Sequence, residues 1–360
     1  MKIVVFGLTV SSSWGNGHAT LWRGLCGALG RLGHHVTFFE RDAPYYAAAR
    51  DLTDLSPHAL RIYATWESVR DEARAALDGA DAALVTSYCP DALAASELVL
   101  DSSARVRAFY DLDTPVTLAR HRAGRPVDYL GPEGLSRFDV ALSFTGGPAL
   151  TELTSRLGAR RAVALHGSVD PEVYRPARPR TLFRADLSYL GTCSADRQAA
   201  LFALFLEPTR RSPERRFVLG GSLYPHDFPW LGNLHHVGHV APHDHAAFYG
   251  SSPLTLNITR GPMAEMGYCP SGRLFEAAAA GVAVVSDAWE GLDGFFTPGR
   301  EILLARTTDD VLEALARPQE ELAAIGLAAR ERALREHTAD HRALELIDIL
   351  SGTMEGAPEW

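Results

Sequence analysis

The chain has 360 residues, a hydrophobic fraction of 46% and a formal net charge of −9. This length predicts two domains of ordinary size, and the negative charge argues against nucleic acid as a partner. Because the sequence shows no signal peptide and no run of about 18 apolar residues, we expect a cytoplasmic protein without a transmembrane segment.

The first half alternates predicted strands with predicted helices. A buried strand at 2–8 leads into a loop rich in glycine and serine at 9–18, and a helix follows at 21–32. Further strands are predicted at 35–40, 60–63, 82–86, 106–110 and 140–144. This alternation is typical of an α/β fold with a parallel, doubly wound sheet.

A proline-rich stretch at 170–181 separates the two halves, because prolines at this density stop regular structure. The second half repeats the pattern, with strands predicted at 187–191, 216–219, 236–237, 254–257 and 282–285. The last part, 309–350, is expected to be mostly helical. We therefore predict two Rossmann-like domains, at 1–168 and 182–335, with a linker at 169–181 and a final helix at 336–360.

The stretch from Pro270 to Asp287 predicts a helix, a tight turn and a buried strand. Ser271 is a candidate N-cap, and Gly281 is suited to end the helix in the left-handed conformation. The helix is apolar on almost every side except at Glu276. A carboxylate in such a place needs a partner. Either Arg273, three residues earlier, or a ligand with paired hydroxyls, such as the ribose of a nucleotide, could supply it.

Two groups of residues suggest a metal at first sight. Asp111 and Asp113 form a D-x-D sequence, which holds a divalent cation in some enzymes. Five histidines also cluster in one stretch, namely His235, His236, His239, His243 and His245. A three-residue pattern such as D-x-D is a weak signal. The spacing of the histidines is irregular, and Pro242 lies among them. We therefore predict a solvent-facing loop for the histidines, and no metal site. The four cysteines include no close pair.

Several motifs resemble those of glycosyltransferases with the GT-B fold, and the chain is most similar to bacterial glycosyltransferases of the spore-maturation (CgeB-like) type. The motifs extend over both halves in the expected order: GNGHATLWRGLCGALGRLGHHV, FYDLDTPVTL, SVDPEVYRP, YLGTCSADRQ and TRGPMAEMGYCPSGRLFEAAAAGVAVVSDAWEGLDGFF. The resemblance implies two domains that face each other across a cleft, with the C-terminal helix crossing back to the first domain.

The resemblance also implies a nucleoside-diphosphate sugar as donor, bound mainly by the second domain, and no cofactor. Glu276 would bind the ribose hydroxyls. The helix start at Ser271, Gly272 and Leu274 would hold the diphosphate together with Arg197, Arg260 and Arg273. Retaining relatives carry a second glutamate eight positions earlier, where this chain has Tyr268.

The acceptor is expected to lie against the first domain, near the glycine loop Gly15, Asn16 and Gly17. His18 follows this loop and is a candidate general base, since an alcohol needs a base for efficient attack. Asp111 or Asp113, at the end of a strand in the same sheet, would support His18, as in some inverting enzymes. His18 could instead only cap its helix or bind the acceptor.

We therefore predict a metal-independent glycosyltransferase acting on an acceptor hydroxyl. A nucleotide-sugar epimerase and a non-catalytic nucleotide- or glycan-binding protein are the alternatives. The His–Asp pair favours inversion and the Glu276 motif favours retention, so the sequence leaves the stereochemical outcome open. It also leaves open the nucleobase, the sugar, the acceptor and the oligomeric state.

Overall fold

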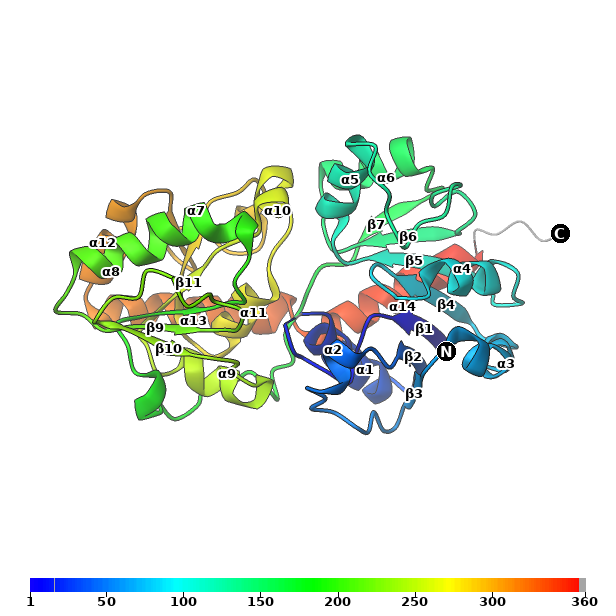
Figure 1. Ribbon diagram of the computed structural model, residues 1–360, viewed down its shortest axis with the longest axis horizontal. Coiled ribbons are helices and arrows are strands. Elements are labelled where there is room, and N and C mark those ends of the chain that lie inside the picture. The colour runs from blue at the N-terminus through cyan, green and yellow to red at the C-terminus, as the bar shows by residue number, and fades with distance from the viewer. Residues whose placement is uncertain (16, 356–360) are drawn as a thin grey trace. The chain divides into compact units, whose positions relative to one another are not determined.

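Parallel β-strands build two separate sheets in the computed structural model, which describes residues 1–15 and 17–355 (Figure 1). The chain divides into a first unit, Met1–His166 with Ala339–Trp360, and a second unit, Gly167–Thr338. Asn16 of the predicted glycine loop lies outside the described residues.

The first unit contains a seven-stranded sheet in the order β3-β2-β1-β4-β5-β6-β7. Its strands are β1 (Lys2–Gly7), β2 (His35–Arg41), β3 (Ala59–Tyr63), β4 (Ala82–Thr86), β5 (Val106–Asp111), β6 (Val140–Ser143) and β7 (Ala162–Ala164). Its helices are α1 (His18–Arg31), α2 (Pro44–Ala47), α3 (Trp66–Leu77), α4 (Ala92–Leu100), α5 (Thr114–Arg122), α6 (Pro148–Leu157) and α14 (Ala339–Glu355).

The second unit contains a six-stranded sheet in the order β10-β9-β8-β11-β12-β13. Its strands are β8 (Leu187–Leu190), β9 (Phe217–Gly220), β10 (Leu234–Val237), β11 (Leu254–Asn257), β12 (Ala283–Asp287) and β13 (Leu303–Ala305). Its helices are η1 (Thr181–Phe183), η2 (Ala195–Arg197), α7 (Gln198–Leu201), the π-helix η3 (Phe202–Leu206), α8 (Glu207–Arg211), α9 (Pro242–Tyr249), α10 (Gly261–Met266), α11 (Gly272–Ala279), η4 (Leu292–Gly294), α12 (Thr308–Ala316) and α13 (Gln319–Glu336).

All strand pairs in both sheets are parallel, as the alternation of strands and helices predicts. The strands of the first sheet from β1 to β6 are largely apolar because helices cover both faces of such a sheet. The three-residue strands β7 and β13 are absent from the sequence-based prediction, because runs this short carry no periodicity.

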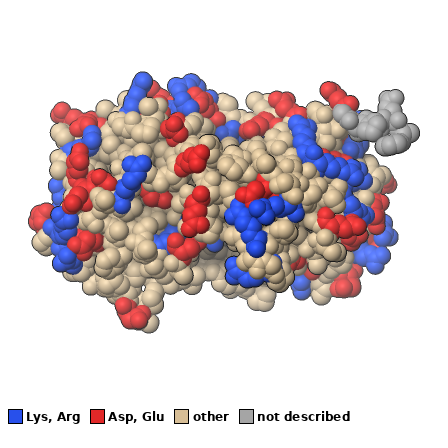
Figure 2. Space-filling model, turned by 90° about the horizontal axis from the view of Figure 1, so that it is seen from above, with Lys and Arg blue, Asp and Glu red and all other residues tan. Residues whose placement is uncertain are grey.

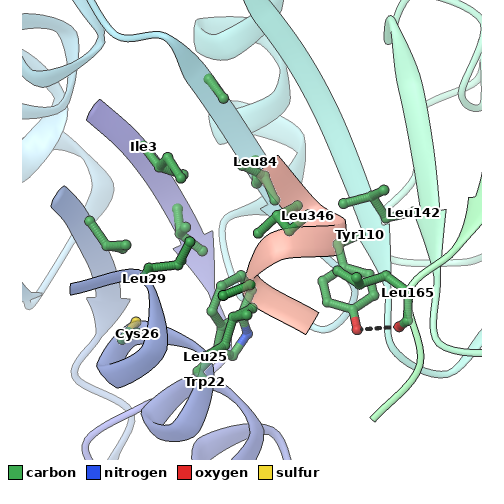
Figure 3. Close-up of a cluster of buried hydrophobic side chains, with 14 of the residues drawn as sticks. Ile3, Trp22, Leu25, Cys26, Leu29, Leu84, Tyr110, Leu142, Leu165 and Leu346 are labelled. Atoms are coloured by element: carbon green, nitrogen blue, oxygen red, sulfur yellow. Dashed lines mark hydrogen bonds between the residues drawn. The ribbon is translucent and has the colours of Figure 1, made fainter. Parts of the chain in front are cut away.

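The C-terminal helix α14 is part of the first unit. Its side chains Ala343, Leu346 and Leu350 are buried in the same cluster as Trp22 and Leu25 of α1. Figure 1 shows this helix, drawn in red, among the blue and cyan elements of the first unit, and Figure 3 shows Leu346 near Leu84 of β4 and Tyr110 of β5. The first core is therefore built from two segments that lie far apart in the sequence.

The stretch predicted as a linker, residues 169–181, packs with the second unit. Tyr174 is 5% exposed and belongs to the core cluster that also contains Phe275 of α11. The prolines nevertheless keep the stretch free of helix and strand as far as residue 180 apart from one bridge, between Val169 and Thr338. The proline-rich composition therefore indicates irregular backbone, while burial of Tyr174 makes the segment part of the second unit.

Positive and negative side chains are interspersed over the face shown in Figure 2. Many arginines there and elsewhere pair with carboxylates, as Arg137 does with Glu97 and Asp101. In the described parts of the chain, no helix is both long and apolar enough to cross a membrane.

Candidate active site

The first sheet reverses its strand order between β1 and β4. In doubly wound sheets, ligands bind beyond the carboxyl ends of the strands at such a reversal. The loop after β1 leads to His18, the loop after β4 contains Tyr88, and β5, the next strand, ends at Asp111. The topology thus brings the predicted base and both predicted carboxylates to one edge of one sheet.

His18 and Asp113 contact each other across this edge. The distance between His18 Nε2 and Asp113 Oδ2 is 3.4 Å, and the two side chains are only 12% and 13% exposed. His18 is the first residue of α1, and Asp113 precedes α5 without capping it. The carboxylate therefore faces the imidazole ring instead of the helix.

Asp111 lies behind this pair. It is 1% exposed, and its Oδ1 accepts a hydrogen bond from the backbone N–H of Asp113 at 3.0 Å. No hydrogen bond is found for its Oδ2, and burial raises the pKa of this carboxyl to about 6. Of the two carboxylates that the sequence leaves open, Asp113 contacts His18 and Asp111 shapes the turn that presents Asp113.

A second buried carboxylate, which the sequence analysis missed, fixes the loop after β1. Glu40, at 1% exposure, accepts hydrogen bonds from Thr9 Oγ1 (2.9 Å) and from the N–H groups of Val10 (2.7 Å) and Ser11 (2.9 Å). The signal available in the sequence was a glutamate at the end of an otherwise apolar strand. Farther along the loop, Gly15 has φ +68°, a conformation that favours glycine.

In the second unit, Glu276 lies on α11, and its side chain is 13% exposed. The hydroxyl of Tyr249 donates a hydrogen bond to Glu276 Oε2 at 3.1 Å, and His245 Nδ1 lies 3.8 Å from the same oxygen. Arg273 does not pair with Glu276; it bonds to Asn257 instead. The ion-pair alternative considered from the sequence is therefore wrong for this side chain.

Arg273 reaches the point where the second sheet reverses its order, between β8 and β11. Its Nη1 donates to Asn257 Oδ1 at 3.1 Å, and its guanidinium lies 5.5 Å from the centre of the Tyr189 ring. A Cβ atom at Gly191 would lie 3.2 Å from Nη2. Glycine at the end of β8 thus leaves room for a cation at the reversal point, where ligands of such sheets bind.

The start of α11 differs in detail from the prediction. Ser271 occupies the N-cap position, but its hydroxyl donates to Asn257 Oδ1 at 2.7 Å instead of capping the helix. Leu274 is fully buried in the core, and its N–H bonds to the Ser271 carbonyl at 3.0 Å. Leu274 therefore holds the helix in place, which leaves Gly272 and Arg273 to offer the first backbone amides.

The other two predicted arginines have protein partners. Arg260 Nε donates to Asp196 Oδ2 at 2.9 Å, and Arg197 Nη2 donates to the Thr192 carbonyl at 2.8 Å. Asp196 lies next to Arg197 in η2, so Arg260, which precedes α10, contacts the segment after β8. The structure joins Ser271 and Arg273 through Asn257 and places Arg260 and Arg197 around Asp196.

Polar residues at the ends of β11 and β12 complete this region and were not predicted as a group. Asp287 accepts hydrogen bonds from the N–H and the hydroxyl of Thr259, both at 3.0 Å, and burial raises its pKa. Asn257 donates to Ser286 Oγ at 2.9 Å while accepting from Ser271 and Arg273. Asn257 is thus the hub between α11 and the sheet.

The histidine-rich stretch is not one solvent-facing loop. His235 and His236 lie on the edge strand β10 and are exposed, whereas His245 lies on α9 and is 14% exposed. The α-helical period places His245 and Tyr249 on the same side of α9, toward Glu276. Over the residues that the structure describes, no three His, Cys, Asp or Glu side chains group as a metal site.

Comparisons with known proteins agree with this arrangement. Residues 197–348 match the family described as "Glycosyl transferase-like". The chain has the GT-B fold. The fold predicted from the sequence is confirmed, and the family match agrees with the resemblance over residues 197–348, whereas the spore-maturation subtype stays a prediction. No curated protein is significantly similar to this chain in sequence.

Solved GT-B structures share the fold of this chain over nearly all of both chains. Sucrose-phosphate synthase from Thermosynechococcus elongatus is similar with a TM-score of 0.73 at 15% identity, covering 99% of this chain and 100% of that one. HepE from Anabaena, in complex with UDP and glucose, is similar with a TM-score of 0.68 at 13% identity, covering 98% of this chain and 100% of that one. An alpha-glucosyltransferase in complex with UDP-glucose and DNA is similar with a TM-score of 0.73 at 12% identity, covering 98% of this chain and 99% of that one. At these identities the likeness establishes the fold.

Proposed function

We propose that this protein transfers a sugar from a nucleoside-diphosphate sugar to an acceptor hydroxyl, without a bound metal ion or cofactor. The surroundings of the Glu276 carboxylate are the main support for this proposal. Among the described residues, the hydroxyl of Tyr249 donates a hydrogen bond to one of its oxygens, so the carboxylate retains acceptor capacity for the hydroxyl groups of a ligand.

The carboxylate of Glu276 lies close to the start of its own helix. A Cβ atom at Gly272 would lie 3.7 Å from Glu276 Oε1, so this oxygen faces the first turn of α11. The backbone amides of that turn favour an anion, and Arg273 follows at once. Ribose hydroxyls at Glu276 and a diphosphate at Gly272 and Arg273 would be neighbouring groups of one ligand.

The pair of His18 and Asp113 supports transfer to an alcohol. In the proposed reaction the acceptor oxygen forms a bond to the anomeric carbon, and the bond from that carbon to the diphosphate breaks. The acceptor proton passes to His18, and Asp113 stabilises the imidazolium that forms. The electron pair leaves with the diphosphate, whose charge Arg273 and the start of α11 would balance.

The proposal also covers place and partners. We place the reaction in the cytoplasm and expect no nucleic acid as acceptor. The net charge of −9 supports this expectation, because a nucleic-acid surface requires a concentration of basic side chains. The solved relative bound to DNA shares the fold, and its acceptor is a property of that protein.

Thermal unfolding with UDP, GDP, ADP, TDP and CDP tests the donor site. We expect one of them to stabilise the wild type, by about 2.7 kcal/mol at a hundred times its dissociation constant. Glu276→Gln should lose most of this shift, since the amide still accepts from Tyr249 but offers the ribose one acceptor oxygen fewer. Glu331→Gln is the matched control, as Glu331 is an exposed side chain on α13 of the same unit.

His18→Gln separates binding from catalysis. The variant should keep the nucleotide shift and lose about a hundredfold to ten-thousandfold in the rate of sugar transfer. Absence of any nucleotide shift in folded wild type would overturn the proposal in favour of a non-catalytic protein. Conversion of the donor into an isomeric nucleotide sugar without an acceptor would instead establish an epimerase.

A further inference from the structure

A strained tyrosine adjoins the His–Asp pair. Within residues 1–15 and 17–355, three residues other than glycine have a positive φ, namely Tyr88 (61°), Leu223 (67°) and Tyr268 (50°). This conformation is unfavourable for a side chain with a Cβ atom, and it persists only where the surroundings enforce it. Strained residues of this kind concentrate at ligand sites, so the contacts of Tyr88 decide what its position means.

Tyr88 follows the strand that lies between the two strands leading to His18 and Asp113. It follows β4, which is hydrogen-bonded to β1 on one side and to β5 on the other. Its ring meets the His18 ring edge-on, with centroids 6.1 Å apart and planes at 70°. The same ring lies 5.0 Å from that of Tyr129. Tyr88 is half-buried, while Cys89 after it is buried.

Tyr129 provides a rigid backing for the Tyr88 ring. It is 3% exposed, and its hydroxyl pairs with Thr117 Oγ1 at 2.7 Å. Tyr129 also stacks against Phe109 of β5, with centroids 6.3 Å apart and planes at 19°. The Tyr88 ring is therefore held in one orientation beside the base, which is what an aromatic platform for a ligand requires.

The charges around this platform select a neutral ligand. Asp111 and Asp113 place two carboxyl groups at the same sheet edge, so an anionic group would be repelled. Three arginines of the first unit are paired with carboxylates: Arg23 of α1 with Asp51, Arg41 of β2 with Asp91 and Arg50 with Asp42. Carboxylates accept hydrogen bonds from hydroxyl groups, and the electron-rich face of an aromatic ring attracts polarised C–H groups. Sugars carry both groups.

We propose that Tyr88 is an acceptor-contacting residue and that the acceptor is a neutral saccharide. One sugar ring lies against the Tyr88 ring, and one hydroxyl of that sugar points to His18. The left-handed backbone at Tyr88 orients the ring toward the base, which the extended conformation of the preceding strand would not do. This inference rests on the proposed function, since it identifies the class of acceptor for that reaction.

Two substitutions separate the ring from the backbone. Tyr88→Gly removes the ring and suits the positive φ, so the variant should fold at least as well as the wild type. We expect its KM for a saccharide acceptor to rise about tenfold, with the KM for the donor unchanged. Tyr88→Phe keeps the ring and should stay within about threefold of the wild-type KM. Equal acceptor KM values for wild type and Tyr88→Gly would overturn the role of Tyr88.

Binding of the intact protein to an array of neutral, sulfated and sialylated glycans gives a readout that needs no donor. We expect the wild type to bind neutral glycans and Tyr88→Gly to lose that binding. Binding only to charged glycans, or to none, would overturn the saccharide class. If nucleotides fail to stabilise the protein while Tyr88-dependent glycan binding persists, the transferase proposal fails and the glycan site stands.

Discussion

At the scale of single residues, burial decides how the carboxyl groups of the first unit behave. Asp111 is 1% exposed and burial raises its pKa to about 6. For Asp51, burial also acts to raise the pKa, but hydrogen bonds from Arg23 and Ser13 outweigh it and lower the pKa to about 2. Two aspartates of one unit thus respond to pH in opposite directions.

Asp111→Asn should stabilise the protein at neutral pH. The folded state takes up a proton at Asp111 at a higher pH than the unfolded chain does. The ionised group therefore destabilises the fold above about pH 6, and less so as the pH falls toward 4. We expect the free energy of unfolding to rise by about 1–3 kcal/mol at pH 7.5 and by less at pH 5, measured by urea unfolding.

Asp51→Asn is the control of opposite sign. The pKa of Asp51 is lowered in the folded state. The ionised Asp51 therefore stabilises the fold fully above the pKa of the unfolded chain, near 4, and this stabilisation is lost only as the pH falls through about 2. This substitution should destabilise the protein equally at pH 7.5 and pH 5. A gain from Asp111→Asn that is the same at both pH values would contradict the raised pKa of Asp111.

At the scale of elements, glycine sets how closely α13 approaches the α11–β12 turn. A Cβ atom at Gly326 of α13 would lie 2.5 Å from the carbonyl oxygen of Gly281 and 2.9 Å from the backbone nitrogen of Ala283. Gly281, with φ +78°, ends α11 as the sequence predicts. The contact is backbone against backbone, so no side-chain rotation can relieve a clash.

Gly326→Ala should therefore destabilise the protein by about 1–3 kcal/mol, because α13 must move away from the turn. Gly352→Ala on α14 is the matched control, since a Cβ atom there meets nothing within 4 Å. Alanine is the better helix former, so this change should stabilise by about 0.5–1 kcal/mol. Urea unfolding of both variants tests the two predictions. An unchanged free energy of unfolding for Gly326→Ala would show that α13 has freedom to shift.

At the scale of the whole molecule, the two units differ in chain continuity. The second unit is one segment, Gly167–Thr338, whereas the first combines Met1–His166 with the helix α14. The apolar residues of α14 fill the core around Trp22 and Tyr110, whose hydroxyl donates to the Leu165 carbonyl at 2.7 Å (Figure 3). Without α14 this surface would be open to water.

A fragment of residues 167–338 should consequently fold alone, and a fragment of residues 1–166 should not. Circular dichroism should show cooperative unfolding for the former, with the same nucleotide preference as the intact protein. Residues 1–166 should gain cooperative unfolding when the segment 339–355 is fused to them. Cooperative folding of residues 1–166 alone would show that α14 is dispensable for the first core.

The sequence by itself determined the elements and their order. Apolar runs predicted most strands to within one or two residues, and strands β4 and β11 were predicted with the bounds observed, because strands of a sheet covered on both faces are rich in apolar residues. Local signals also placed α11, its first residue after Ser271 and its end before Gly281. They identified Glu276 as a carboxylate that needed a partner.

Only the tertiary structure decided which residues meet. His18 and Asp113 are 95 positions apart, and nothing local distinguishes Asp113 from Asp111. Tyr249, Asn257 and Tyr88 acquire their contacts from the order of strands in the sheets and from a strained backbone. The physical reason is that periodicity reports burial of one segment at a time, whereas a hydrogen-bonding partner depends on where separate segments come together.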